Sequence, residues 1–277
     1  MSPFPTFFKT GHRGARGLSP ENTLVSFIEA IQLGANTLEL DIVVSKDGQL
    51  VVSHEPYMNH EFCLQPNGKE IRKEEEVLFN LYHMTYDEIK QYDCGMKTHP
   101  RFLDQKKIPA YKPLLSEVIA HCENYILQNN LPSIVYDIEI KSEIQEYSLS
   151  QPLPECFSEL LLSFIDIVNL SQKVTIRSFD QAPLKYIHLK APQLPIALIV
   201  ENHLSAQENI GNLGFVPFMY SPEYTLLTIP EMTYLTSIKT LVVPWTVNTL
   251  PEINEMLKLG VNGIITDYPN LFKTMEI

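Results

Sequence analysis

The sequence lacks a long hydrophobic run. Among its 277 residues no stretch of about 18 consecutive apolar residues occurs, and a helix needs about that length to cross a membrane. We therefore expect no integral membrane segment. Residues 1–5 also lack the charged and apolar regions of a secretory signal peptide. This favours a cytoplasmic protein, or a periplasmic or secreted one if a signal peptide has been removed.

Cysteine and positive charge are both scarce. No two cysteines form a CxxC pair, so neither a zinc knuckle nor a redox motif is indicated. The chain has 21 Lys and Arg against 33 Asp and Glu, for a net charge of −12, and no basic run, which argues against a nucleic-acid partner. An acidic protein with an anionic substrate needs local positive charge, from a metal or a few placed cations. The four scattered cysteines are Cys63, Cys94, Cys122 and Cys156.

What is present is a regular alternation of short β-branched runs with helical stretches, which is typical of βα units around a parallel sheet. About eight strands and eight helices are predicted, so the fold class is α/β and the expected architecture is a TIM (β/α)8 barrel. A doubly wound open sheet would also alternate, but no GxGxxG follows the first strand. The expected strands are 6–10, 37–44 with 49–53, 134–140, 173–176, 196–200, 218–221, 240–243 and 263–266. The expected helices begin at 20–23 and end before Gly34, then cover 114–128, 155–170, 183–189, 205–213, 229–237, 251–259 and the residues from 271.

Residues 55–113 interrupt this alternation. They are polar, irregular and rich in charge, with too few apolar positions for a core of their own. We interpret them as a small insertion after the second strand rather than an independent domain. Residues 1–277 are then expected to form a single barrel domain.

Carboxylates gather on two of the predicted strands. Glu39 and Asp41 are two residues apart, as are Glu139 and Lys141, and the period of a strand places each pair on one face. Carboxylates on an inner face need a positive partner. Three oxygen ligands suit Mg²⁺ or Ca²⁺ better than Zn²⁺. A polar surface strand, or a buried Glu–Lys pair without a catalytic role, remains the alternative.

Two histidines follow predicted strands. His12 comes after the first and His54 after the second, and histidine takes and gives protons near neutral pH. Arg13 offers a planar fork for phosphate oxygens, or alternatively a salt bridge to a carboxylate. Phe179 and Trp245, also after strands, are expected either to wall a pocket or to pack.

Short motifs along nearly the whole chain, in order, resemble those of the glycerophosphodiester phosphodiesterases. The spacing of the HRG, ENT and ExD groups makes the resemblance specific. The motifs are Gly11-His12-Arg13-Gly14, Pro20-Glu21-Asn22-Thr23, Glu39-Leu40-Asp41, Val52-Ser53-His54, Asp93-Cys94-Gly95, Lys107-Ile108-Pro109, Glu139-Ile140-Lys141, Trp245-Thr246-Val247-Asn248 and Gly263-Ile264-Ile265-Thr266-Asp267-Tyr268-Pro269.

The resemblance implies a TIM barrel with an insertion at about 55–113 and a role for each candidate residue. It implies one divalent cation, Mg²⁺ or Ca²⁺, and a small-molecule substrate. The implied metal ligands are Glu39, Asp41 and Glu139, the implied acid–base pair is His12 and His54, and the implied phosphate contacts are Arg13 and Lys141.

The implied reaction converts a glycerophosphodiester, such as glycerophosphocholine or glycerophosphoethanolamine, to sn-glycerol 3-phosphate and an alcohol through a cyclic phosphate. One departure concerns the alcohol group: where the family commonly has His-Asp followed by Arg-Thr-Thr, this chain has His54-Glu55-Pro56. Two alternatives remain open. One is a phospholipase D-like or phosphoinositide-directed phosphodiesterase of the same fold, and the other is a non-catalytic barrel that binds phosphoesters.

Overall fold

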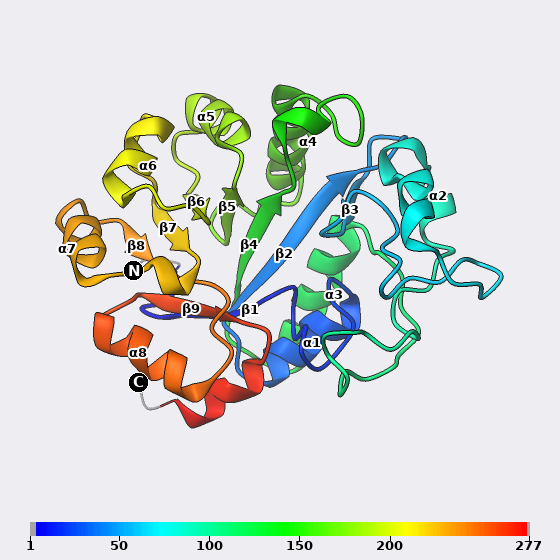
Figure 1. The fold of residues 1–277 in the computed structure, drawn as a ribbon, viewed down its shortest axis with the longest axis horizontal. Helices are drawn as coiled ribbons and strands as arrows, with labels where there is room; N and C mark the ends of the chain where they lie inside the picture. Colours follow the sequence, from blue (N-terminus) through cyan, green and yellow to red (C-terminus); the bar gives the residue numbers. More distant parts are fainter. Residues whose placement is uncertain (1–3, 276–277) are drawn as a thin grey trace.

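Parallel strands form the centre of the molecule. The computed structural model describes residues 4–275, and in it the strands lie side by side in the order β8-β7-β6-β5-β4-β2-β1-β9 (Figure 1). Backbone hydrogen bonds from Asn262 to Val242 and from Ile265 to Pro244 bring the two ends of this order together. The strands are β1 (Phe8–Gly11), β2 (Thr37–Val44), β4 (Val135–Ile140), β5 (Val174–Ser178), β6 (Ile196–Val200), β7 (Met219–Pro222), β8 (Leu241–Val242) and β9 (Gly263–Thr266).

Helices surround the strands, so the predicted TIM barrel is confirmed (Figure 1). Local sequence explains their ends. Ser205 and Thr249 form capping boxes at two helix starts, and Gly214 and Gly260 take the left-handed conformation that ends a helix. The helices are α1 (Leu24–Gln32), α3 (Leu115–Gln128), α4 (Pro154–Ile167), α5 (Gln181–Lys190), α6 (Ala206–Leu213), α7 (Ile229–Ser237) and α8 (Leu250–Leu259).

Several predicted helices differ from the structure at their ends. The helix predicted at 155–170 is Pro154–Ile167, and the one predicted at 183–189 is Gln181–Lys190. The first and last helices of the chain differ as well. The first begins at Leu24 rather than at residues 20–23, because Asn22 has a φ of 55° and Thr23 serves as the N-cap. The closing helix is a 3-10 helix, Pro269–Thr274, which starts before Leu271. These differences leave the order of elements unchanged.

The alternation of side chains along β2 separates the two sides of the barrel wall. Leu38, Leu40 and Ile42 are fully buried in the layer between strands and helices. Glu39 and Asp41 point the other way, into the barrel. A small apolar cluster, separate from that layer, consists of Phe8, Ala197, Met219, Val243 and Ile265.

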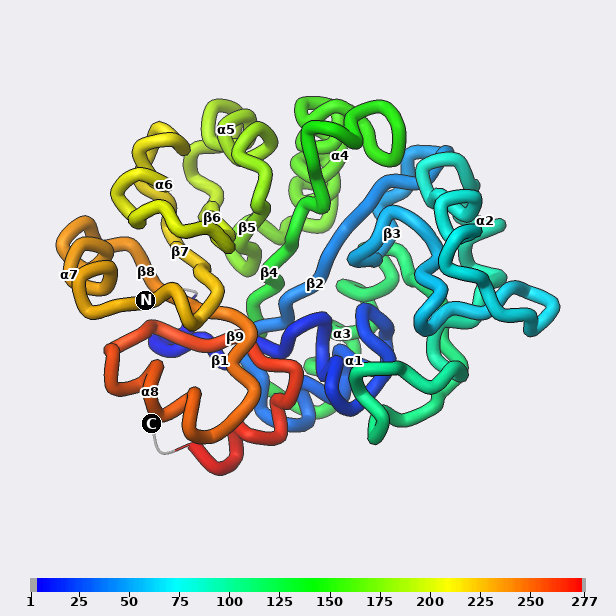
Figure 2. The backbone as a smooth tube through the Cα atoms, viewed as in Figure 1, coloured from blue at the N-terminus to red at the C-terminus, as the bar shows by residue number. Residues whose placement is uncertain are grey.

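Residues 55–113 lie beside β2 and β3 (Leu50–Val52), which pairs antiparallel with β2 (Figures 1 and 2). They contain the short helix α2 (Tyr86–Ile89) and the 3-10 helices η1 (Lys73–Phe79) and η2 (Leu81–His83). The expectation that this insertion has no core is wrong in one respect. It has a buried apolar cluster, but Val43 and Val51 of the barrel complete it.

The longest helices described are of ordinary globular length. Within residues 4–275 none is long and apolar enough to cross a membrane.

Candidate active site

Three carboxylates meet at the carboxyl ends of β2 and β4. The register pairs Asp41 with Glu139 and Glu39 with Asp137, so these side chains share the inner face. One oxygen from each of Glu39, Asp41 and Glu139 lies within 4.8 Å of the others, and all three residues are buried. Asp41 Oδ1 has no hydrogen-bond partner. A cluster of hard oxygen donors with an unpartnered buried oxygen fits a divalent cation.

The carboxyl groups of this cluster have pKa values shifted in opposite directions. Burial, followed by the neighbouring Asp41 carboxylate, raises the pKa of Glu39 well above its usual value. Burial also acts to raise the pKa of Asp41, but the positive charges of Arg13, His54 and Lys141 outweigh it and hold that pKa well below its usual range. Like charges so close together favour a shared positive partner.

Arg13 and Lys141 supply positive charge beside the carboxylates. The Arg13 backbone N–H donates to Glu39 Oε2 at 2.8 Å, and its guanidinium donates to Glu21 at 2.6 Å and lies 3.3 Å from Asp41. Lys141 Nζ donates to Glu139 Oε1 at 2.7 Å and lies 3.8 Å from Asp41 Oδ1. Arg13 is therefore engaged in salt bridges, which was the alternative interpretation of this residue.

His12 follows β1 and is held by a carboxylate from the other end of the chain. Its Nδ1 lies 2.7 Å from Asp267 Oδ1, and its Nε2 lies 4.0 Å from Glu39. Asn248 donates to the other Asp267 oxygen at 2.8 Å. Burial lowers the pKa of His12 to about 4, although Asp267 acts to raise it. His12 is neutral at pH 7, and with Nδ1–H donated to Asp267 its Nε2 can accept a proton.

His54 repeats this arrangement at the end of β3. Its Nδ1 lies 3.0 Å from Glu55 Oε1, and Ser53 Oγ donates to the Glu55 carbonyl at 2.6 Å. The His54 side chain is 32% exposed against 12% for His12. Burial acts to raise the pKa of Glu55, but the hydrogen bond with His54 and its charge lower it. Two histidine–carboxylate pairs thus flank the acidic cluster, and the His54 pair is the more open of the two.

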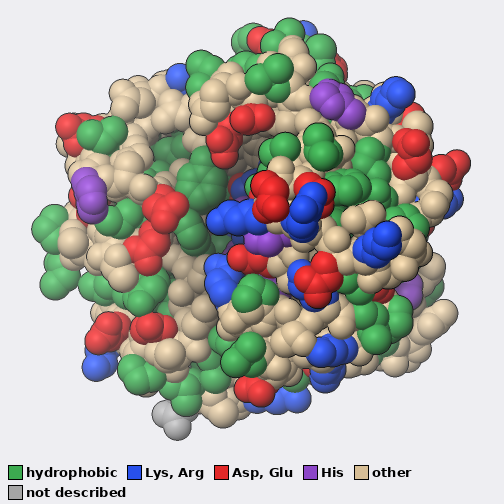
Figure 3. Space-filling model, turned by 45° about the vertical axis from the view of Figure 1, so that its right-hand side comes forward, with side chains coloured by type: hydrophobic (Ala, Val, Ile, Leu, Met, Phe, Trp, Pro, Cys, Tyr) green, Lys and Arg blue, Asp and Glu red, His purple; other side chains and the backbone are tan. Residues whose placement is uncertain are grey.

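An aromatic wall borders the mouth of the barrel. The rings of Phe179 and Trp245 meet edge to face at 5.6 Å, and Lys141 Nζ lies 5.8 Å from the centre of the Phe179 ring. Phe179 is 41% exposed. Figure 3 shows a hollow near the middle of one face of the molecule, with basic, acidic and histidine side chains gathered at its edge. This arrangement suits a small anionic ligand with an apolar part.

Sequence reasoning missed three residues of this site. Asp267 and Glu55 orient the histidines, and Arg177 on β5 donates to Asp137 at 2.6 Å beneath the cluster. Their positions relative to the predicted strands could have identified them. Asp267 and Glu55 each follow a strand end, and Arg177 has the inward register of Glu139.

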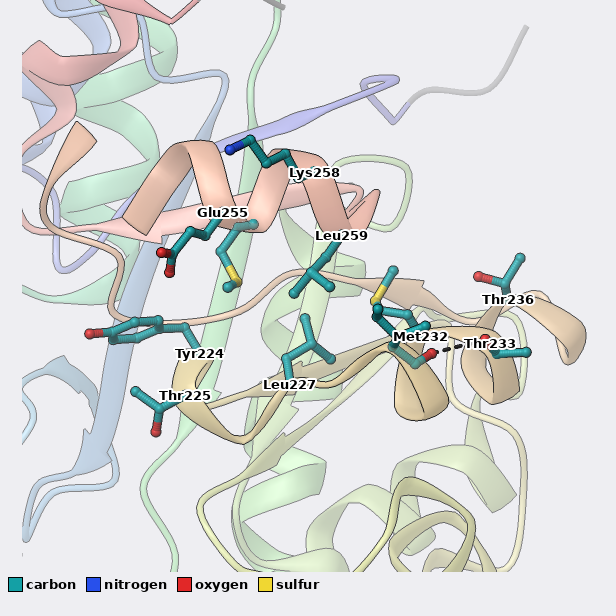
Figure 4. Close-up of a pocket in the computed structure, with 11 residues that line it drawn as sticks. Tyr224, Thr225, Leu227, Met232, Thr233, Thr236, Glu255, Lys258 and Leu259 are labelled. Carbon is teal, nitrogen blue, oxygen red and sulfur yellow. Dashed lines mark hydrogen bonds between the residues drawn. The ribbon is translucent and has the colours of Figure 1, made fainter. Parts of the chain in front are cut away.

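A separate cavity of about 970 Å³ opens between α7 and α8. Figure 4 shows Met232 and Thr233 on α7 and Lys258 and Leu259 on α8 around it. None of the carboxylates or histidines described above lines it, so it is not the site of the chemistry.

Known proteins match the chain along almost its whole length. Residues 12–271 match the sequence model of the Glycerophosphoryl diester phosphodiesterase family. A protein named glycerophosphodiester phosphodiesterase from Caldanaerobacter subterraneus subsp. tengcongensis is 30% identical over 261 residues, covering 93% of both chains.

Two solved phosphodiesterase structures are similar to this one in fold. A structure from Silicibacter pomeroyi DSS-3, assigned to the glycerophosphoryl diester phosphodiesterases, is similar with a TM-score of 0.82 and 26% identity over 96% of this chain and 92% of its own. An Oleispira antarctica phosphodiesterase in complex with its product sn-glycerol-3-phosphate has a TM-score of 0.74 and 20% identity over 99% of this chain and 98% of its own.

Proposed function

Since this chain belongs to the glycerophosphoryl diester phosphodiesterase family and is a phosphoric diester hydrolase, we propose that it cleaves glycerophosphodiesters such as glycerophosphocholine and glycerophosphoethanolamine. The products are sn-glycerol 3-phosphate and the free alcohol. The observation that carries the proposal is the meeting of two histidine–carboxylate pairs at one acidic cluster. The product found in the Oleispira antarctica relative supports the same substrate class.

The two histidines divide the proton transfers. His12, the less exposed of the two and neutral, accepts the proton of the glycerol hydroxyl next to the phosphodiester at Nε2. That oxygen attacks phosphorus, and His54, the more exposed partner, donates a proton to the departing alcohol. The cyclic phosphate is then opened by water with the roles reversed, which regenerates both histidines. Asp267 and Glu55 keep each ring in the tautomer that presents Nε2.

The acidic cluster completes the proposal. Glu39, Asp41 and Glu139 would hold one divalent cation, Mg²⁺ or Ca²⁺. When bound, such an ion offsets negative charge on the phosphate and acidifies the attacking hydroxyl. Lys141 Nζ, between Glu139 and the exposed Phe179, lies where it would contact a phosphate oxygen. Phe179 and Trp245 would wall the side of the pocket that receives the rest of the substrate.

The test is direct measurement of sn-glycerol 3-phosphate released from glycerophosphocholine and glycerophosphoethanolamine, with Mg²⁺, Ca²⁺ or EDTA. We expect turnover with at least one metal and none after thorough chelation. Binding of either compound without turnover under all metal conditions would favour the non-catalytic barrel. Turnover that persists after chelation would contradict the role of the acidic cluster.

A second candidate substrate class is the lysophospholipids, because an exposed apolar rim lies near the site. Val77 and Leu78 of η1 are 66% and 76% exposed. Asn80, which follows η1, donates to the Leu149 carbonyl at 3.1 Å, so the end of η1 lies near the segment that follows β4. Ile144, three residues after Lys141, is 75% exposed in that loop. Such a rim suits contact with an acyl chain or a lipid surface.

The two substrate classes are separated by rates on glycerophosphocholine and lysophosphatidylcholine. The double variant Leu78→Asp, Ile144→Asp is expected to lose lysolipid turnover while keeping turnover of the short diester. Ile167→Asp on α4, where Ile167 is 83% exposed, is the matched control. Equal effects of both variants on both substrates would rule out a lipid role for the rim.

A further inference from the structure

We propose that Cys63 and Cys94 are a disulfide-forming pair that joins two segments of the insertion, residues 55–72 and 93–113. Both cysteines are free thiols in the structure. The pair is distinct from the barrel site, so the proposal stands apart from the proposed function. It also modifies the conclusion from the sequence, in which the four cysteines are simply scattered.

The backbone register places the two cysteines opposite each other. Leu64 and Asp93 form an antiparallel bridge and exchange both backbone hydrogen bonds, at 2.6 and 3.2 Å. Cys63 and Cys94 are therefore the next pair along, at a position without hydrogen bonds between the strands. At such a position Cα atoms are about 4.5 Å apart and side chains are closest. A disulfide needs a Cα separation of about 4.4–6.8 Å.

Other hydrogen bonds agree with this placement of the two cysteines. The Cys63 N–H donates to the Asn59 carbonyl at 2.9 Å and the Cys94 N–H donates to the Ala110 carbonyl at 2.7 Å, so both amides are bonded away from the bridge. The two thiols are within hydrogen-bonding reach of each other. Both cysteines belong to the buried cluster of the insertion, where neighbours restrict their rotamers.

A buried ammonium group lies beside the thiols. Lys112 donates to Ser53 Oγ at 2.7 Å, and its Nζ lies 5.5 Å from the centre of the Phe62 ring. Burial raises the pKa of the Cys63 thiol, and the Lys112 charge acts in the opposite direction. A neighbouring cation favours the thiolate, which is the nucleophile in disulfide exchange.

The oxidant is a low-molecular-weight disulfide. One cysteine thiolate attacks a sulfur of that disulfide and releases a small thiolate, which leaves a mixed disulfide on the protein. The second cysteine thiolate then attacks the protein sulfur and releases the other small thiolate. Two protein thiols are oxidised, one small disulfide is reduced to two thiols, and the two protons pass to the released thiolates.

The test maps the bond directly. Reduced protein is equilibrated with oxidised glutathione, both folded and during refolding from urea so that burial does not block access. It is then alkylated in denaturant, digested without reductant and analysed by mass spectrometry. We expect a cross-linked peptide pair containing Cys63 and Cys94, with Cys122 and Cys156 alkylated. Four alkylated cysteines under both conditions, or a different dominant pair, would overturn the proposal.

A second measurement uses thermal unfolding. The bond closes the loop of residues 63–94, and we expect oxidation to raise Tm by on the order of 5 °C. Cys63→Ala is expected to abolish this shift, whereas Cys156→Ala, which changes an exposed cysteine on α4, keeps it. A shift that persists in Cys63→Ala contradicts the assignment, and mapping of the wild-type protein stays decisive if that variant does not fold.

Discussion

The two halves of the barrel interior differ in charge although they share one fold. On β2, β4 and β5 inward positions carry charged side chains, whereas on β6 and β7, and at Val243 just after β8, they are small or apolar. The charged set is Glu39, Asp41, Asp137, Glu139 and Arg177, and the other set is Ala197, Met219, Ser221 and Val243. The framework does not require charge in its interior, so the charged half reflects the chemistry of the site.

Buried charges persist there because most of them are paired. Arg177 donates to Asp137 at 2.6 Å, and Lys141 donates to Glu139 at 2.7 Å. Removing one partner of such a pair costs about 3–5 kcal/mol because the other charge is left uncompensated. Asp41 is paired with Arg13 through Oδ2, but its Oδ1 accepts no hydrogen bond, and that oxygen lies where a cation is proposed. The comparison therefore predicts that changes in the charged half lower activity, whatever they also cost in stability, and that changes in the apolar half act on stability alone.

The largest effect is expected from the acidic cluster. Asp41→Asn should lower kcat/KM by about 10³-fold or more, and chelation of the wild-type protein should do the same. The reason is that a bound cation supplies several kcal/mol of transition-state stabilisation. Added Mg²⁺ or Ca²⁺ should restore the chelated wild type but not the variant. Steady-state rates measure this, with Glu123→Gln on α3 as the control. An Asp41→Asn enzyme of normal activity would break the comparison.

Loss of the proposed base is expected to come next. His12→Ala should reduce kcat by about 10²–10³-fold, because general acid–base catalysis contributes on that order. The exposed His121 on α3 offers a matched control, and His121→Ala should leave the rate unchanged. The rates are compared at saturating substrate with folding verified by circular dichroism. Full activity of His12→Ala would rule out His12 as the base.

A smaller loss is expected from the carboxylate that orients His12. Asp267→Asn keeps the shape of the side chain but weakens the hold on Nδ1–H, and we expect kcat to fall by about 10–100-fold. KM should change little, because Asp267 lies behind the ring at 2.7 Å and does not face the cluster. A change in KM alone would show that Asp267 acts on binding instead.

The smallest effect on activity is expected at the apolar side. Met219 on β7 is buried in the apolar cluster inside the barrel. Met219→Ala should lower the free energy of unfolding by about 2–5 kcal/mol through loss of packing and leave kcat/KM near the wild-type value. Denaturant unfolding and the standard assay measure the two quantities. A loss of activity without a loss of stability would contradict the division between the halves.

Much of the architecture could be predicted because it depends on local pattern. The strand 37–44 matches β2, 196–200 matches β6 and 263–266 matches β9, since short apolar runs between turn residues determine them. The period of two also places Glu39 with Asp41, and Glu139 with Lys141, before any tertiary contact is known. Helix ends are less predictable, as Asn22 illustrates, because a single positive φ shifts the start of α1.

What the sequence by itself determines about this protein is the order of its elements, the face on which each carboxylate lies and the motifs that resemble one family. Only the tertiary structure decides which of these groups meet. His12 and Asp267 are 255 residues apart and come together because β9 pairs with β1. Cys63 and Cys94 face each other through the bridge of Leu64 to Asp93. Periodicity is a local property, whereas barrel closure and strand pairing depend on contacts between distant segments, so their consequences appear only in the folded chain.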